Sequence, residues 1–468
     1  MPEKILPARL ALSALTVLRP LLDDPLLAGF AALLRETAGE KFAPERWLEH
    51  YSSFYAALLQ RNSRAALSDC LLESLLFTET AFSRACAQAA GEAGDILVQA
   101  MLHDLAALQQ LAELPAGALK AFVLSNAALP ATAAAALRAL PEWRTGLGGT
   151  SVLPPAAVEV AAAFAGCTKW PDCLPQLAAF YRRHGSGKFA RYLGFRWENS
   201  SRGGVLRGID TVDPVRFADL MGYEEQRRVV AENTQLLLQG LPANNLLLYG
   251  DRGTGKSSTV KALLNEYGHL GLRLIEVPQT ALADLPLILR EVKGYRQKFI
   301  LFVDDLSFAE HGEYFTALKA VLEGGLEHRP PHVVIYATSN RRHLVREKFS
   351  ERAGLHSGEH DDEVRAADNL QEKLSLADRF GLTITFLAPD QGRYLELVEK
   401  MAHRRGLAVG KEELRREALR WERWQNSRSP RTARQFVDWL EGRLKLAGPA
   451  ALAGSEAGIS RKDTNTFT

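Results

Sequence analysis

The feature that most constrains the fold is a short stretch, residues 246–258, near the middle of the chain. It reads Leu-Leu-Leu-Tyr-Gly-Asp-Arg-Gly-Thr-Gly-Lys-Ser-Ser: an apolar run, a glycine-rich turn, and a sequence that suits a helix from Lys256 onward. The turn matches the pattern G-x-x-x-x-G-K-[ST], in which glycines let the backbone curl until successive N–H groups point inward. Because the following helix adds the positive end of its dipole, the stretch predicts a strand, a phosphate-binding loop and a helix in that order.

Each part of this loop has an expected task. Lys256 would reach the β- and γ-phosphates of a nucleotide, and the Ser257 hydroxyl would be a ligand of Mg²⁺. The residues expected to hold the nucleotide are Gly250, Asp251, Arg252, Gly253, Thr254, Gly255, Lys256, Ser257 and Ser258. The alternative is a glycine-rich turn without a ligand, and the flanking strand and helix argue against it.

Four further apolar runs read as strands, at 272–277, 299–303, 332–337 and 382–386. They alternate with helical patterns. Together with the strand before the loop, they predict an α/β domain with a five-stranded parallel sheet and helices on both faces. Since an open parallel sheet binds ligands beyond the carboxyl ends of its strands, polar residues that follow these strands are candidates for the chemistry.

Three polar residues follow two of these strands. Asp304 and Asp305 come directly after 299–303; Asp304 would hold Mg²⁺ through water, and Asp305 would polarise an attacking water. Asn340 ends the next strand and could contact the same water and the γ-phosphate, with Thr338 and Ser339 as neighbouring candidates. The pattern therefore predicts a magnesium–nucleotide site at this edge of the sheet.

Three arginines, in two parts of the chain, complete the candidates. Arg379 lies just before the last strand, where it cannot easily reach its own phosphates but could stabilise phosphoryl charge in a neighbouring subunit. A local pair with Asp378 is the alternative. Arg431 and Arg434 lie three apart on one face of a helix that begins near Pro430, and one of them could approach the γ-phosphate. An ordinary solvated helix face is the rival interpretation.

The rest of the chain predicts the organisation around this domain. Residues 1–195 have alanine and leucine at helical spacing and predict an all-helical domain. We expect the remaining boundaries as follows: a connector at 196–218, the nucleotide-binding domain at 219–390, a helical lid at 391–447 and a disordered tail at 448–468. The four cysteines, Cys70, Cys86, Cys167 and Cys173, match no zinc pattern and are expected to be buried, reduced thiols.

Charge and hydropathy bear on the partners and the cellular location expected for the protein. The formal net charge of +2 offers no global argument for nucleic acid or membrane binding. No run of 18 apolar residues and no signal-peptide pattern are present, so we expect a cytoplasmic protein without a membrane span.

The order of these motifs resembles that of an AAA+ ATPase. The sequences of residues 243–258 and 374–382 resemble even more closely those of a bacterial AAA family known only as predicted ATP-binding proteins of unknown function. The resemblance implies that Asn340 is the first sensor, Arg379 the arginine finger and Arg431 the second sensor. It also implies that Leu220, Met221, Gly222 and Tyr223 line an adenine pocket, and that ATP binds between subunits of a ring or open ring.

Two departures from that resemblance bear on function. Asp305 stands where most AAA+ members have glutamate, so the base is one methylene shorter and turnover could be slow. Residues 277–283 lack the aromatic–hydrophobic–glycine loop of threading members, which argues against polypeptide threading.

Three functions stay open at this point. The first is a magnesium-dependent ATPase that remodels or loads a protein partner held by the helical N-terminal domain. The second is a nucleic-acid-associated helicase-loader or initiator-like protein, suggested by the Asp304-Asp305 pair, which such relatives share, and by arginines near Trp421 and Trp424. The interleaved glutamates suit an ordinary charged helix better. The third is an ATP-binding assembly switch with little turnover.

Overall fold

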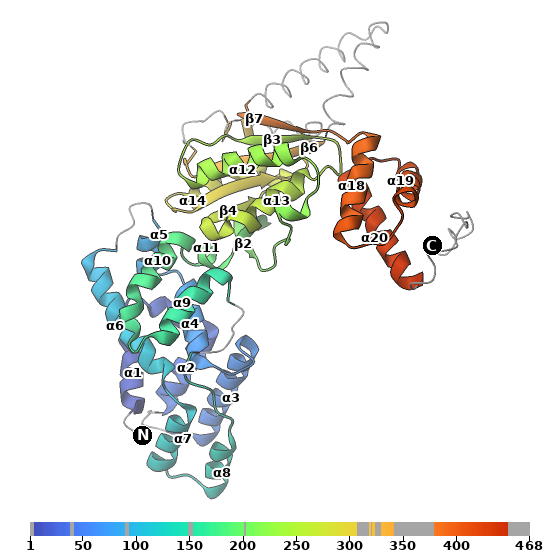
Figure 1. Ribbon diagram of the computed structural model, residues 1–468. Helices are drawn as coiled ribbons and strands as arrows, with labels where there is room; N and C mark the ends of the chain where they lie inside the picture. Colours follow the sequence, from blue (N-terminus) through green and yellow to red (C-terminus); the bar gives the residue numbers. More distant parts are fainter. Residues whose placement is uncertain are drawn as a thin grey trace.

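The computed structural model describes residues 4–37, 42–88, 93–147, 153–200, 203–306, 318–319, 321–322, 329–340 and 379–447. Figure 1 shows a helical N-terminal region, a central sheet covered by helices, and three C-terminal helices beside the sheet. Two expected features fall outside the described residues: the long connection after Asn340, up to residue 378, and the tail from 448. The sequence pattern at 314–323 predicts a helix, which lies almost wholly outside the described residues as well. The predicted domain boundaries stay predictions.

The N-terminal region is helical throughout its described part, as predicted. Its α-helices are α1 (Ile5–Ser13), α2 (Pro25–Thr37), α3 (Pro44–Arg61), α4 (Leu67–Phe77), α5 (Ala81–Ala87), α6 (Asp95–Ala112), α7 (Ala116–Asn126), α8 (Ala131–Ala139), α9 (Pro155–Gly166), α10 (Leu174–His184) and α11 (Lys188–Arg191), with 3-10 turns η2 (Arg19–Asp23) and η3 (Trp170–Cys173). Proline occupies the first turn of α3, α9 and α10, where its missing N–H costs nothing. On α3, Trp47, Tyr51 and Phe54 are buried, so this aromatic stripe faces the core.

The cysteine prediction was wrong for one pair. Cys167 and Cys173 form a disulfide, because the chain turns back between the end of α9 and η3 and brings their Cα atoms to 6.9 Å. Cys70 and Cys86 are free and buried, as expected. Burial raises the pKa of the Cys70 thiol to about 12.

The sheet has seven strands, not five, in the order β2-β1-β4-β5-β6-β3-β7. The strands are β1 (Gly194–Ser200), β2 (Gly203–Ile209), β3 (Leu246–Gly250), β4 (Leu272–Glu276), β5 (Lys298–Val303), β6 (Val333–Asn340) and β7 (Leu382–Phe386). The five predicted strands pair in parallel. The two additional strands form an antiparallel hairpin whose first strand pairs in parallel with β4.

Glycines explain why the hairpin was not predicted. Residues 203–208 read as a break in the chain, yet a Cβ at Gly204 would lie 2.0 Å from the Trp197 ring, and one at Gly208 would lie 2.1 Å from the Tyr192 ring. The aromatic rings therefore lie directly on β2, and glycine is required there by packing and not by a turn. The segment expected to be a connector extends the sheet instead.

Each face of the sheet carries a hydrophobic core, as expected for parallel strands covered on both sides. On one face Ile275, Leu301 and Ile335 pack with Ile288 of α14 (Leu285–Val292). On the other, Leu248, Ile300 and Tyr336 pack with helices α12 (Glu224–Leu238) and α13 (Lys256–Tyr267). Alternate residues of one strand thus serve opposite cores, which fixes the register at which the strand ends meet.

Three helices follow β7 in the stretch expected to form a helical lid, and we call them the lid below: α18 (Gln391–Arg404), α19 (Lys411–Gln425) and α20 (Pro430–Ala447). They enclose a core of their own that includes Tyr394, Leu414 and Phe436. Figure 1 places them beside the sheet, on the side of β6 and α13. In the part of the chain that the structure describes, every helix is too short or too polar to cross a membrane.

Candidate active site

The loop between β3 and α13 has the conformation that its glycines predict. Gly250, Gly253 and Gly255 have φ values of 144°, 78° and 91°, in the region that favours glycine. A Cβ at Gly250 would lie 2.1 Å from the backbone oxygen of Phe386, so β7 approaches this residue too closely for any side chain. The loop therefore depends on glycine for both its turn and its packing.

A cavity of about 510 Å³ lies over this loop. Many of the predicted site residues line it: Arg252, Gly253, Thr254, Gly255, Lys256, Ser257, Ser258, Asp304, Asp305, Asn340 and Arg431. The predicted residues Gly222, Tyr223, Gly250, Asp251 and Arg379 do not line it. The cavity also includes residues that the sequence analysis did not propose, namely Asp219, Arg227, Thr259, Met401 and Pro430.

Lys256 is 6% exposed and points back along the loop. Its Nζ donates to the backbone oxygens of Gly250 at 2.9 Å and Asp251 at 2.8 Å, and to Asn340 Oδ1 at 3.1 Å. Burial lowers the pKa of Lys256 to about 8, against three nearby carboxylates that raise it. The ammonium thus sits between the loop and the end of β6, where phosphate oxygens could replace its present acceptors.

The paired carboxylates after β5 are held by hydroxyl and amide groups. Ser257 Oγ and Thr338 Oγ1 each donate to Asp304 Oδ1 at 2.6 Å. Asp305 has a left-handed φ of 54°, its N–H donates to Thr338 Oγ1 at 2.8 Å, and its carboxylate accepts from Asn340 Nδ2. A hydroxyl beside a carboxylate is a donor set that suits Mg²⁺, which takes few protein ligands and keeps several waters.

The lid contacts the loop through the start of α20. The Arg431 N–H donates to the Gly253 oxygen at 3.2 Å, and a Cβ at Gly253 would lie 2.7 Å from Ser429 Oγ. Arg434, one turn later, donates to the Asp219 oxygen at 3.3 Å. Both arginines line the cavity, but Arg431 adjoins the phosphate loop while Arg434 adjoins the segment before α12.

The expected adenine segment divides into two parts. Leu220 and Met221 line the cavity. Gly222 and Tyr223 do not line it, and both have positive φ values, 73° and 60°. The Tyr223 hydroxyl donates to the Leu387 oxygen at 2.5 Å, and Arg227 of α12 donates to the Gly222 oxygen. Arg227 lies one helical turn after Tyr223, and that spacing is the signal that could have identified it.

Asp251 does not line the cavity and bonds instead to the end of β7 and the segment after it. Its N–H donates to the Phe386 oxygen at 2.9 Å, and its Oδ2 accepts from the Ala388 N–H at 2.7 Å. Ala388 lies between β7 and α18. The second residue of the phosphate loop is therefore tied to the segment that leads into the lid.

Arg379 lies at the opposite edge of the sheet from the loop. It precedes β7, whose first residue, Leu382, pairs with Leu246 at the start of β3, whereas the loop follows Gly250 at the end of β3. Those strand ends are separated by about 13 Å at the usual rise of about 3.3 Å per residue. This position fits a residue that acts on a neighbouring subunit, which stays a prediction.

The fold and the cavity together define the class. Because a helical lid closes over a phosphate loop at the carboxyl edge of a parallel sheet, the chain is a P-loop protein of the AAA+ class. Within that class it belongs to the family described as a protein of unknown function (DUF815), whose family model matches residues 190–444.

Comparisons with individual proteins give weaker similarities. A 145-residue stretch, 26% of this chain, is 28% identical to the 26S proteasome regulatory subunit 4 homolog of Encephalitozoon cuniculi (strain GB-M1). The chain spans about a third of that protein's length, 34%. Among solved structures, the RuvB Holliday junction branch migration motor of Thermotoga maritima is 16% identical over 50% of this chain and 66% of its own, with a TM-score of 0.32. The T158V variant of the same protein is 15% identical to this chain over the same shares of both chains, with a TM-score of 0.34. Structural likenesses this weak carry no weight for function.

Proposed function

We propose that the chain is a Mg²⁺-dependent ATPase that binds and hydrolyses ATP. The observation that carries the proposal is the meeting of Lys256, Ser257, Asp304, Asp305 and Asn340 around one cavity above the phosphate loop. The chemistry requires a cation for the phosphates, ligands for a metal and a base for water, and each is present.

The position of each residue around the cavity suggests its role in ATP hydrolysis. The loop N–H groups and Lys256 would bind the β- and γ-phosphates, with Lys256 exchanging its present acceptors for phosphate oxygens. Ser257 and Asp304 would hold Mg²⁺, which would neutralise phosphate charge when bound. Asp305 would take a proton from the attacking water, and Asn340, now bonded to both Lys256 and Asp305, would orient that water.

The position of Arg379 supports an assembly in which the site is completed by a second subunit. At the edge of the sheet opposite the loop, its guanidinium could stabilise the transferring phosphoryl group only in a neighbouring copy. We therefore propose a homo-oligomer, a ring or an open ring. Its energy would be used to remodel or load a protein partner held by the N-terminal helices.

One observation favours the alternative of a nucleotide-dependent switch. The Asp305 side chain is one methylene shorter than that of glutamate, and its carboxylate already accepts a hydrogen bond from Asn340. Both features would slow activation of the attacking water. Among the residues that the structure describes, no comparable observation favours nucleic acid. Several arginines of the lid are paired with acidic neighbours, as in Arg415–Glu399, Arg420–Glu417 and Arg428–Glu422.

Steady-state phosphate release from the full-length protein tests the proposal. Lys256→Ala is expected to lower the rate by about 100-fold or more, because it removes the cation at the phosphates. Lys261→Ala is the matched control, since Lys261 lies on the same helix outside the cavity. Asp305→Asn should keep ATP bound without turnover. Wild-type turnover by the Lys256→Ala protein would refute hydrolysis at this site, and ATP binding without any turnover by the wild type would establish the switch.

A further inference from the structure

We propose that Thr338 is a positioning residue that aligns both carboxylates of the site for the metal and for the attacking water. The inference rests on the proposed function, and it adds a residue whose task is to orient Asp304 and Asp305. Thr338 lies on β6 two residues before Asn340, so both side chains point to the same face of the sheet. It is 2% exposed and lines the cavity.

The hydroxyl of Thr338 forms two hydrogen bonds of opposite sense. The Thr338 hydroxyl donates to Asp304 Oδ1 at 2.6 Å. Because the Asp305 N–H can only donate, the same oxygen accepts from it, at 2.8 Å. One buried hydroxyl therefore fixes the side chain of one acid and the backbone of the next.

The bond from Thr338 to Asp304 determines which carboxylate oxygen of Asp304 is available to a metal ion. Three donors end on its Oδ1: Ser257 Oγ, Thr338 Oγ1 and, at 3.2 Å, the Asp305 N–H. Ser257 would turn toward Mg²⁺ when the ion binds, so Thr338 is the side chain that would continue to orient the carboxylate. Its Oδ2 would then face the hydration shell of the ion.

The second bond holds Asp305 in a conformation that a non-glycine residue rarely adopts. With a φ of 54°, its backbone is in the left-handed region, which persists only when surrounding contacts over-determine it. Besides the bond to Thr338, the Asp305 oxygen accepts from Gln279 Nε2 at 2.5 Å. This turn points the carboxylate toward Asn340 at the end of the next strand.

The backbone of β6 supports the same role. The Thr338 oxygen accepts from the Leu306 N–H at 2.7 Å, so the residue bonds to the turn after β5 with backbone and side chain alike. Its strand position is set by pairing with Leu248 of β3. Thr338 thus links the strand before the phosphate loop to the turn that carries the two acids.

Valine is the informative substitution, because it has nearly the same shape but no hydroxyl. In Thr338→Val the two acids lose a common partner, and loss of such a partner typically costs about 10- to 100-fold in metal affinity or activity. Two readouts are needed. The first is the affinity of a fluorescent ADP analogue with and without Mg²⁺. The second is the separate measurement of kcat and KM for ATP.

We expect Thr338→Val to lose about 10-fold or more of the Mg²⁺-dependent gain in ADP affinity while binding without Mg²⁺ stays within about threefold. We expect kcat to fall by about 10- to 100-fold with little change in KM. Thr338→Ser should restore both. Thr234→Val is the control, because it removes another buried hydroxyl, bonded to the Val230 oxygen and paired with the Tyr336 hydroxyl outside the cavity.

Wild-type Mg²⁺ dependence in Thr338→Val, or failure of Thr338→Ser to restore it, would overturn the inference. Should the valine protein fail to fold, Thr338→Ala gives the second hydroxyl-free comparison against Thr338→Ser under the same criteria. If the wild type binds ADP with Mg²⁺ but shows no turnover, hydrolysis is refuted, while the binding comparison still decides the role of Thr338.

Discussion

At the scale of single residues, the site depends on backbone positions as much as on reactive groups. Gly250 and Gly255 both have positive φ, but their surroundings differ. A Cβ at Gly250 would overlap the Phe386 backbone, whereas one at Gly255 would have nothing within 4 Å. The same substitution therefore has two different physical consequences within one loop.

We predict that Gly255→Ala lowers the free energy of unfolding by about 1–2 kcal/mol, the usual cost of a side chain in the left-handed region. Gly250→Ala should cost about 3 kcal/mol or more, because the clash is with backbone that cannot rotate away. Urea unfolding of both variants measures the difference. Equal losses would mean that the close approach of β7 has no energetic consequence.

At the scale of elements, the lid meets the nucleotide domain at two places. The start of α20 contacts the loop through Arg431 and Gly253, and Arg404 and Arg434 bind the segment before α12 through Asp219, with Arg404 Nη2 at 3.1 Å from its carboxylate. The lid therefore contacts both the phosphate loop and the segment before α12, and residues of all three parts line the cavity.

The two arginines of α20 allow a direct comparison. Because Arg431 adjoins the phosphate loop, Arg431→Met should weaken ATP binding by about 10-fold or more, the value of one or two charge-assisted hydrogen bonds. Arg434→Met should change it by less than about threefold, since Arg434 contacts a backbone oxygen of Asp219. Titration calorimetry with ATP distinguishes them, and the reverse order would assign the sensor to Arg434.

At the scale of the whole molecule, a buried arginine joins the helical region to the sheet. Arg273 of β4 is fully buried, and its guanidinium donates at 2.8 Å to the oxygens of His184, Phe189 and Leu272. Two of these acceptors belong to the end of α10 and to α11, and the third to β4 itself. Burial lowers the pKa of Arg273 to about 9.

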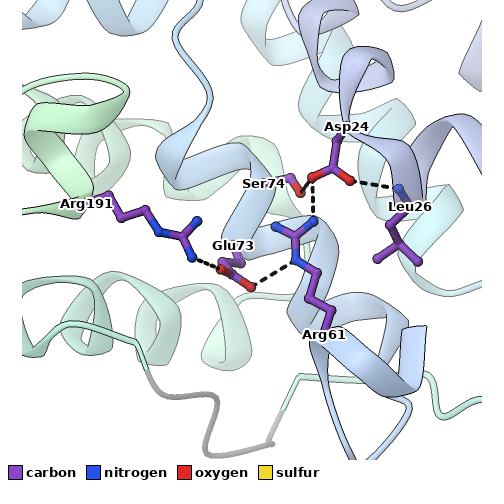
Figure 2. A network of polar contacts seen from close by, with 6 residues as sticks. All are labelled: Asp24, Leu26, Arg61, Glu73, Ser74 and Arg191. Atoms are coloured by element: carbon purple, nitrogen blue, oxygen red, sulfur yellow. Dashed lines mark hydrogen bonds and ion pairs between the residues drawn. The ribbon is translucent and has the colours of Figure 1, made fainter. Parts of the chain in front are cut away.

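A second polar path continues from this junction into the helices, as Figure 2 shows. Arg191 of α11 pairs with Glu73 of α4 at 3.2 Å, Glu73 pairs with Arg61 of α3 at 3.2 Å, and Arg61 pairs with Asp24 before α2. These pairs connect α11 to three other segments of the helical region, namely α4, α3 and the residue before α2.

We predict that Arg273→Met uncouples the two regions, because methionine leaves the buried carbonyls without donors at a cost of about 1–3 kcal/mol each. Limited proteolysis between residues 184 and 194 should become about 10-fold faster, while ADP affinity stays within about threefold. Arg207→Met is the control, since Arg207 is 71% exposed on the hairpin. Unchanged proteolysis would show that the junction is held by its apolar contacts alone.

Local sequence determined the parts of this protein that depend on backbone conformation and on the ends of single elements. The glycine spacing of the loop, the strand that carries Asp304 and Asp305, the Asn340 strand end and the lid helix at Pro430 could all be predicted, because each is encoded within a few neighbouring residues. The placing of Lys256, Ser257 and both acids around one cavity agrees with those local patterns.

Only the tertiary structure decided which distant groups meet. The ring of Trp197 packs directly on Gly204 of β2, and the turn after α9 brings Cys167 to Cys173. Strand register places the Thr338 hydroxyl within hydrogen-bonding distance of both Asp304 and Asp305. It also turns Tyr223 and Asp251 away from the cavity and puts Arg379 at the far edge of the sheet. Such contacts depend on how whole elements pack, and a side chain's partner across that packing leaves no periodic pattern in the sequence around it.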